Sequence, residues 1–312
     1  MSRPFAAAVA VAIGAALLGT SCGGGSEESA GNTTTAASSK QTLEQLWRAP
    51  GADVAVVPGT SDHAVGTNRI SFLVVDKQSR LIERPTARVW VARGLKQVPY
   101  ATTVAKLEPI GVPGGDTADA NGIYVAEVAT PTAGRYWFMA EPVGGTKIQA
   151  LGNMVVRKKS LAPSVGDRAI PSKTPTLAST GGDLSALTTA RHPDRALYQV
   201  SVAQALAAHE PFVLAFATPQ YCQSRTCGPV VDVVSAVRKK ASSKGVRFIH
   251  VEVYKDNDPA NGYNQWMGEW KLPTEPWTFL VAADGKIADR FEGTVSADEL
   301  ETAVREKLLA SQ

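Results

Sequence analysis

Histidine and cysteine are scarce in this 312-residue sequence, and their scarcity limits the kinds of site that it can build. The four histidines, at positions 63, 192, 209 and 250, are widely scattered, and none stands at metal-ligand spacing from another. The sequence also lacks a long basic run, because 32 basic residues are nearly balanced by 29 acidic ones. These absences argue against a histidine-built metal site and against nucleic acid as a partner. We expect no bound cofactor and no resident metal.

The chain begins with an apolar segment that is too short for a comfortable membrane span. The uncharged run from Phe5 to Leu18 follows Arg3 and has the length of the hydrophobic region of a signal peptide. The run leads through Gly19-Thr20-Ser21 to Cys22, and small residues before a cysteine resemble a bacterial lipobox, although Gly19 stands where leucine is usual. The resemblance implies a lipoprotein signal peptide over residues 1–21 and a lipid on Cys22. We therefore expect the protein to be anchored on the extracytoplasmic face of the cell membrane.

Small and polar side chains dominate residues 22–47. Such residues bury too little apolar surface to order a chain, so this stretch is predicted to be a flexible tether.

Residues 48–158 differ from the tether, because short segments rich in β-branched and aromatic residues recur there between turn residues. Their pattern predicts an all-β sandwich and resembles the small immunoglobulin-like modules of bacterial envelope proteins. No catalytic constellation is visible in it, which favours a binding or spacer module.

Residues 159–312 begin with a connector rich in Pro, Ser and Thr and continue with alternating strands and helices. Apolar strands are predicted at 211–217, 247–254 and 278–283, and a helix from Pro229 to about Lys244. Asp284-Gly285 predicts a hairpin turn, and Ser296 with Glu299 forms a capping box at the start of a last helix. The sequence therefore predicts an α/β domain after the all-β domain.

The two remaining cysteines, Cys222 and Cys227, lie in a short loop between a strand and a helix. In an exported chain two cysteines this close usually pair. The start of the following helix offers unpaired N–H groups and a partial positive charge, which both favour a thiolate. A thiolate is the attacking species in disulfide exchange, so this placement indicates a redox-active pair.

This arrangement of strand, cysteine loop, Gly-Pro and helix resembles the redox site of the thioredoxin family. The resemblance implies a thioredoxin-like fold for the C-terminal domain and a cis-proline before the strand that faces the cysteines. Pro273 and Pro276 compete for that role, and we favour Pro276, because Pro273 would leave Pro276 inside the strand. Tyr221, Glu275 and Trp277 would then border a possible substrate groove, although core packing is the usual role of tryptophan at such positions.

The sequence departs from the family in two respects. Four residues separate the cysteines where the family has two, so either Cys222 or Cys227-Gly-Pro matches the attacking position, and we favour Cys222. The buried carboxylate that thioredoxins use for proton transfer is missing, since its strand position falls at or near Ala215.

The best-supported function from sequence is a membrane-anchored thiol–disulfide oxidoreductase. Its partners would be exported protein thiols or a membrane redox protein. Two alternatives stay open. One is a non-catalytic binding module in which the cysteines form a structural disulfide, as their spacing suggests. The other is a copper-handling thioredoxin-fold chaperone, because soft thiolates suit Cu(I).

Overall fold

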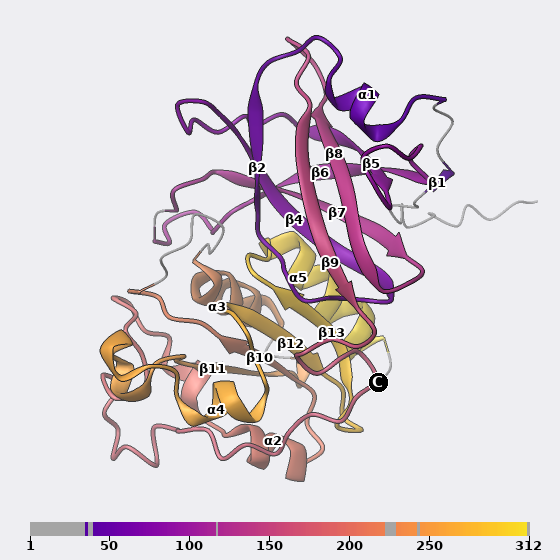
Figure 1. Ribbon diagram of the computed structural model, residues 1–312. Helices are drawn as coiled ribbons and strands as arrows, with labels where there is room; N and C mark the ends of the chain where they lie inside the picture. Colours follow the sequence, from indigo (N-terminus) through magenta and orange to yellow (C-terminus); the bar gives the residue numbers. More distant parts are fainter. Residues whose placement is uncertain (1–34, 37–39, 117, 222–228, 242–243, 311–312) are drawn as a thin grey trace, which may run out of the picture. The chain divides into compact units, whose positions relative to one another are not determined.

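The computed structural model describes residues 35–36, 40–116, 118–221, 229–241 and 244–310, which are drawn in colour in Figure 1. The predictions for the signal peptide and for Cys22, Cys222 and Cys227 fall outside these residues. Within the described part, no helix has the length and apolar character that a membrane crossing needs.

The first part of the chain forms one large sheet. Among the described residues it has nine strands, in the order β2-β4-β7-β6-β5-β8-β9-β3, with β1 paired to β6. All neighbouring pairs are antiparallel except β3 and β9, which run parallel. The strands are β1 Thr35–Ala36, β2 Val54–Pro58, β3 His63–Ala64, β4 Gly66–Asp76, β5 Thr86–Ala92, β6 Ala101–Pro109, β7 Gly122–Thr130, β8 Gly134–Pro142 and β9 Ala150–Arg157.

The sheet consists of two halves that β6 joins, because residues 101–106 of this strand pair with β5 and residues 106–109 pair with β7, which is compatible with the predicted sandwich. Its strands follow one continuous hydrogen-bonded path, and the path curves back on itself, because β2 at one end also contacts β9 near the other. The curvature encloses a core of alternating side chains, among them Phe72, Val89, Tyr124, Tyr136 and Phe138. A strongly twisted sheet of this size curls in order to bury its apolar face.

A short helix, α1 Leu43–Trp47, packs against β5 and β8. Thr42 and Gln45 form a reciprocal capping box at its start. Leu43 is fully buried in a cluster with Trp90 and Met139. Trp90 is therefore buried, where the alternation of its strand predicts an exposed position. The folded part also begins before residue 48, the boundary that composition suggests, because Leu43 supplies an apolar contact that the preceding Gly, Ser and Thr residues lack.

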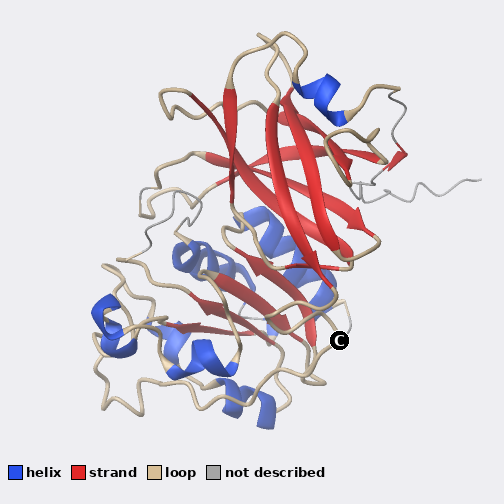
Figure 2. Ribbon diagram, viewed as in Figure 1, coloured by secondary structure: helices blue, strands red, loops and turns tan. Residues whose placement is uncertain are grey.

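The second part of the chain alternates helices and strands around a smaller sheet, as Figure 2 shows. Its described strands follow the order β11-β10-β12-β13, in which β10 and β11 are parallel and the other two pairs are antiparallel. The elements are α2 Val202–Ala207, β10 Phe212–Phe216, α3 Val230–Ala241, β11 Arg247–Val251, α4 Gln265–Glu269, β12 Trp277–Val281, β13 Ile287–Glu292 and α5 Ala297–Ala303. The short 3₁₀ turn η1 Arg195–Tyr198 precedes α2, and η3 Lys255–Asn257 and η4 Pro259–Asn261 lie between β11 and α4. The π-helical segment η5 Val304–Leu309 continues α5.

The order β-α-β, hairpin, helix is the order that the sequence predicts. Ser296 and Glu299 form the predicted capping box of α5. Gly285 has a φ of +80° in the predicted hairpin turn, a conformation that glycine adopts at little cost. The connector before η1 follows an irregular path, and it is attached along the hairpin, because Ala169 N donates to Gly285 O at 2.9 Å and Ile287 N donates to Asp167 O at 2.9 Å.

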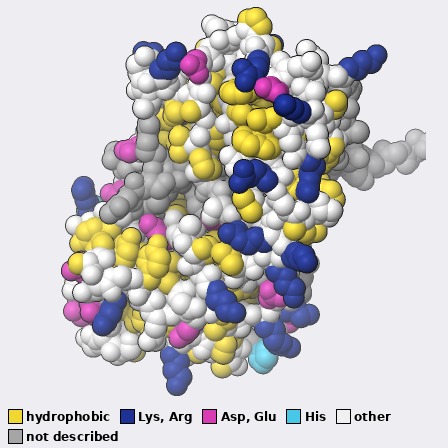
Figure 3. All heavy atoms as spheres, viewed as in Figure 1, with side chains coloured by type: hydrophobic (Ala, Val, Ile, Leu, Met, Phe, Trp, Pro, Cys, Tyr) yellow, Lys and Arg dark blue, Asp and Glu magenta, His cyan; other side chains and the backbone are white. Residues whose placement is uncertain are grey.

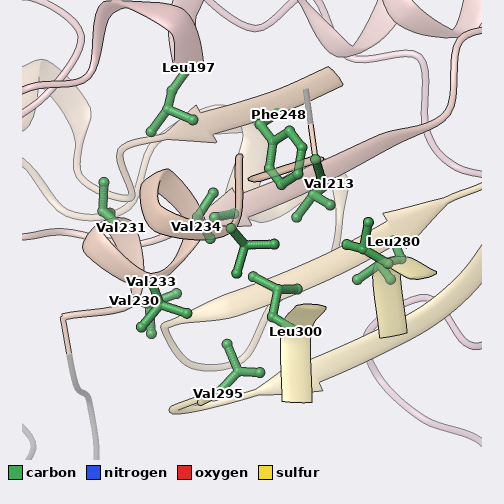
Figure 4. Packing of buried hydrophobic residues seen from close by; sticks show 14 of the residues in the cluster. Leu197, Val213, Val230, Val231, Val233, Val234, Phe248, Leu280, Val295 and Leu300 are labelled. Atoms are coloured by element: carbon green, nitrogen blue, oxygen red, sulfur yellow. The ribbon is translucent and has the colours of Figure 1, made fainter. Parts of the chain in front are cut away.

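Both faces of the small sheet are covered by apolar side chains. On one face, α3 and α5 pack Val230, Val234 and Leu300 against Val213 and Leu280 of the central strands (Figure 4). The spacing of the buried valines in α3 follows the period of a helix, so one side of the helix enters the core. The buried strands leave only their ends free to carry a site.

Replacing Leu300 with alanine is expected to lower the free energy of unfolding by about 2–5 kcal/mol, because the side chain is fully buried between α5 and the sheet. Urea unfolding followed by circular dichroism measures the loss. Val143, which is 52% exposed, provides the control, since its replacement by alanine is expected to change stability by less than about 0.5 kcal/mol. Equal losses in the two variants would contradict the packing described.

Candidate functional site

Three segments meet at one edge of the small sheet. Phe216, the last residue of β10, is paired with Val251, the last of β11, and with Trp277, the first of β12. The residues after β10 and β11 and those before β12 therefore lie side by side. The loop that carries Cys222 and Cys227 starts at this edge, although the cysteines themselves lie outside the described residues.

Pro276 lies at this edge, and the peptide bond between Glu275 and Pro276 is cis. The cis bond falls at Pro276, the proline that the sequence favours over Pro273. Trp277 is only 1% exposed, stacks on Phe279 at 5.6 Å and donates from Nε1 to Thr274 Oγ1 at 3.2 Å. It therefore packs in the core and offers no surface to the predicted groove.

Tyr221 and Glu275 are the other two residues predicted for the groove, and both lie close to Tyr254. The ring of Tyr221 meets that of Tyr254 edge to face at 6.4 Å, and Tyr254 stacks on Tyr263 at 5.6 Å. Burial, and then the charge of Glu275, raise the pKa values of Tyr254 and Tyr263. Glu275 therefore faces the tyrosines, and Tyr263 leaves about half of its surface exposed.

Glu275 is a poor acid for a glutamate. Burial raises its pKa to about 7, and the charge of Glu252 adds to the effect. The two carboxyl groups are therefore close enough to disfavour double ionisation. A carboxyl that titrates near neutral pH can give or take a proton under ordinary conditions, which suits acid–base work at this edge.

Glu252 is the residue of this edge that sequence reasoning missed. It is 4% exposed, and its Oε1 accepts hydrogen bonds from Thr189 N and Thr189 Oγ1, both at 2.6 Å. Its Oε2 is buried with no hydrogen-bond partner among the described residues. Gln220 N in turn donates to Thr189 Oγ1 at 3.1 Å. Thr189 of the connector thus joins a buried carboxylate to the segment two residues before Cys222.

A signal for Glu252 was present in the sequence. The even positions of residues 247–254 place Phe248, His250 and Glu252 on one face of the strand, and polar residues on a buried face at the end of a strand often mark a site. The family's buried carboxylate belongs to the preceding strand, where this chain has Ala215. His250 is paired beside Ala215 in the sheet, so β11 supplies titratable groups in the layer where β10 has none.

His250 is a satisfied buried histidine. It is 2% exposed, its Nε2 lies 3.0 Å from Ala217 O, and its Nδ1 lies 2.8 Å from the Tyr198 hydroxyl. A carbonyl oxygen only accepts, so Nε2 carries the proton and Nδ1 accepts from Tyr198. Burial lowers the pKa of His250, and the ring stays neutral. With both nitrogens engaged by protein atoms, His250 is packed in the core and offers no nitrogen to a metal.

Replacing Tyr198 with phenylalanine is expected to destabilise the protein by about 1–3 kcal/mol, because Nδ1 of the buried His250 would lose its donor. Chemical denaturation of the variant and the wild type measures the difference. Tyr263→Phe serves as a matched control, since Tyr263 is 49% exposed. A Tyr198→Phe protein as stable as the control would contradict the assigned tautomer and its hydrogen bond.

The loop between β6 and β7, residues 110–121, contacts the start of α3. Asp116 N donates to Asp232 Oδ2 in the first turn of the helix at 2.7 Å. Gly111 has a φ of +77°, and a Cβ placed there would approach Pro229 Cγ to 2.8 Å. Only glycine allows so close an approach in this conformation. A loop of the large sheet therefore contacts the N-terminal end of α3, the helix that follows the cysteine segment.

No group of three or more His, Cys, Asp and Glu residues in the described part of the chain is arranged to hold a metal ion. Glu252 and Glu275 form only a pair, and each belongs to a protein network of hydrogen bonds or charges. The chemistry that this edge supports with its own side chains is proton transfer and the orientation of the adjoining loop.

Comparison with solved structures gives matches of low similarity, two of which are described here. One is a thiol:disulfide interchange protein of the thioredoxin family from Chlorobium tepidum TLS, with 15% identity and a TM-score of 0.24, covering 32% of this chain and 80% of that one. The other is the Lin-41 filamin domain, with 16% identity and a TM-score of 0.20, covering 35% of this chain and 100% of that domain. No protein-family model and no curated protein matches the sequence.

Proposed function

We propose that this protein is a thiol–disulfide oxidoreductase whose redox centre is the pair Cys222 and Cys227 on a thioredoxin-like domain. The observation that carries the proposal is the meeting of β10, β11 and β12 at one edge, which brings the start of the cysteine loop beside Glu275, Pro276 and Glu252. The strand order β11-β10-β12-β13, with one parallel and two antiparallel pairs, supports the fold assignment.

The following helix supports thiolate chemistry in the loop. α3 runs over 12 residues from Val230, and its first turns are buried against the sheet. Cysteines at such helix starts reach pKa values of roughly 3.5–7.5, against about 8.5 for a free cysteine. The negative charge that Glu275 acquires above neutral pH acts in the opposite direction, because it disfavours a nearby thiolate. The pKa of the attacking thiol therefore depends on whether Glu275 is protonated, and it is higher when Glu275 is charged.

Glu252 takes the role of the missing carboxylate in this proposal. It reaches the segment before Cys222 through Thr189 and Gln220, and its second oxygen has no described partner to satisfy it. Together, Glu252 and Glu275 accept the proton from the second thiol as it attacks the mixed disulfide, and the electron pair of the broken S–S bond leaves with the substrate sulfur. In this direction the substrate disulfide is reduced and the cysteine pair oxidised, and the reverse exchange oxidises exported protein thiols.

The lipid anchor on Cys22 and the β-rich domain complete the proposal. The anchor would hold the protein on the extracytoplasmic face of the cell membrane, where its partners would be exported protein thiols or a membrane redox protein. The β-rich domain is a spacer or binding module of the immunoglobulin-like kind, and the contacts of its loop with Pro229 and Asp232 suggest that it also steadies the start of α3.

The test is catalytic cycling of the full-length protein. The protein is mixed with a glutathionylated peptide and dithiothreitol, and release of the free peptide is followed with time. We expect many turnovers per protein molecule, and none from the Cys222→Ser/Cys227→Ser variant. A stable disulfide that never turns over would instead favour a structural module, and tight stoichiometric binding of Cu(I) without turnover would favour copper handling. Either result would contradict the oxidoreductase proposal.

A further inference from the structure

A partly open cavity of about 580 Å³ is lined by residues other than those described at the cysteine edge. It is bordered by the turn after β3, by the first residues of the connector and by the end of α4. Its volume is within the range of small-molecule sites in proteins. Its lining includes the apolar residues Val65 and Leu161 and the cationic residues Lys158, Lys159, Arg168 and Lys271.

The charges around the cavity are unbalanced. Four cationic side chains and two carboxylates line it. Both carboxylates are engaged by the protein, since Asp167 Oδ2 accepts from Ser164 N at 2.8 Å and Glu269 Oε2 accepts from Ser172 Oγ at 2.5 Å. In contrast, Lys158, Lys159 and Lys271 form no ion pair within the described part of the chain. The cavity therefore carries an excess of two positive charges.

One wall of the cavity is held in place before any ligand arrives. The buried Asp62 accepts hydrogen bonds from Leu161 N at 2.9 Å, from Ala162 N at 3.1 Å and from the Ser160 hydroxyl, and Arg290 Nη1 donates to its Oδ2 at 3.3 Å. Arg290 Nη1 donates to Pro163 O at 3.2 Å. A preformed wall lowers the entropy cost of binding, so a small ligand can be recognised by few contacts.

The backbone conformation of Lys271 is a second, independent indication that the cavity binds a ligand. α4 ends at Glu269 with Trp270 as its C-cap, and Lys271 follows with a φ of +52°. Leu272 N donates to Met267 O at 2.9 Å. Glycine is the usual residue at this left-handed position after a helix, because a Cβ is disfavoured there. Here a lysine takes the position and adds its charge to the cavity lining.

Apolar surface adjoins the cationic groups. Val65 and Leu161, both in the lining, are 45% and 44% exposed. On the face drawn in Figure 3, dark blue Lys and Arg side chains likewise lie among yellow hydrophobic ones. A ligand that satisfies the cavity needs about two negative charges and a short apolar portion, and a phosphate monoester has both.

We propose that this cavity binds a phosphate monoester with a small apolar substituent, the phosphate meeting Lys158, Lys159 and Lys271 and the substituent meeting Val65 and Leu161. The site uses none of the residues of the cysteine edge, so it stands independently of the redox proposal. A dianion of this kind neutralises the excess charge of the lining, which a neutral or singly charged analogue does not.

Calorimetric titration of the full-length protein with phenyl phosphate tests the proposal. We expect saturable binding that weakens by about tenfold or more in Lys158→Gln/Lys159→Gln and in Lys271→Gly, whereas Lys96→Gln, outside the lining, binds as the wild type does. Lys271→Gly also places glycine where the backbone favours it, so lost binding cannot be ascribed to misfolding. Equal affinity for benzyl alcohol, or unchanged affinity in the lysine variants, would overturn the proposal. Lysine-dependent binding to phosphatidylglycerol vesicles without binding of phenyl phosphate would overturn it too, since it would indicate a flat membrane-docking surface.

Discussion

Replacing either Cys222 or Cys227 with serine is expected to lower turnover of a disulfide substrate by more than about 10³-fold, because each cysteine is indispensable to the cycle. The two single variants should nevertheless differ. The variant that keeps the attacking cysteine still forms a mixed disulfide with the substrate and cannot resolve it, whereas the variant that lacks it forms none. Gel electrophoresis without reductant, together with mass spectrometry, identifies the trapped species.

We expect the Cys227→Ser variant to trap the substrate. Cys222 is the first of the two cysteines after β10, which ends at Phe216, and it is the favoured attacking residue. Trapping by Cys222→Ser alone would assign the attack to Cys227 and move the register by one helical turn. The control is Cys22→Ser, which removes the predicted lipid attachment and is expected to leave turnover unchanged in detergent solution. Full activity in both single variants of the pair would contradict the assigned redox centre.

Replacing Glu275 with glutamine is expected to stabilise the protein above neutral pH by up to about 3 kcal/mol, at 1.36 kcal/mol for each unit of pKa difference. The folded-state pKa of Glu275 is about 7, against 4.5 for an unperturbed glutamate. The folded state therefore holds the proton more tightly than the unfolded state between these two pH values. Stability of the wild type falls as pH rises through this window, and glutamine, which imitates the protonated acid, removes the fall.

Urea denaturation at pH 4 and pH 8 measures this difference. Wild type and Glu275→Gln should be nearly equal at pH 4 and should separate at pH 8. Glu210→Gln provides a control of opposite sign, because a hydrogen bond from Arg247 holds the pKa of Glu210 below its usual value, so that variant loses a little stability at pH 8. If Glu275→Gln were less stable than wild type at pH 8, the carboxyl would not be the buried acid described here.

The same substitution should alter the reactivity of the thiols. Above neutral pH the carboxylate of Glu275 disfavours a thiolate beside it, so Glu275→Gln is expected to lower the pKa of the attacking cysteine. The rate of alkylation by iodoacetamide against pH reports that pKa. An unchanged profile would indicate that Glu275 does not face the cysteine loop.

The elements that sequence patterns predicted best are those whose signals are local. The apolar segments of β10 and β12, the helical valine spacing of α3 and the capping pair of Ser296 and Glu299 each specify an element within a few residues. The strand β6 is harder to predict from sequence, because Lys106 and Glu108 interrupt its apolar pattern. Its strand conformation is fixed by hydrogen bonds to β5 and β7. The curving of the large sheet depends on contacts between its distant ends, which no local pattern records.

Some residues of the candidate site could also be predicted from local sequence, whereas others depend on contacts with distant residues. Pro276 could be chosen because Pro273 would leave Pro276 inside the strand, a relation within one stretch of chain. The alternation of residues 247–254 marks Glu252 as a polar residue on a buried face, but its link to the cysteine segment could not be predicted. That link depends on Thr189, 63 residues earlier, which folds back and donates two hydrogen bonds to Glu252. The burial of Trp277 likewise follows from its stacking on Phe279 and from packing against other elements, which the sequence does not reveal.

The reduction potential of the Cys222–Cys227 pair tests the central claim most directly. The full-length protein is equilibrated in glutathione buffers of graded potential, and the oxidised fraction is read by alkylation and mass spectrometry. A redox-active pair at the start of a helix is expected between about −270 and −120 mV, the range of known disulfide oxidoreductases. A value below about −300 mV would mark a structural disulfide and contradict the account.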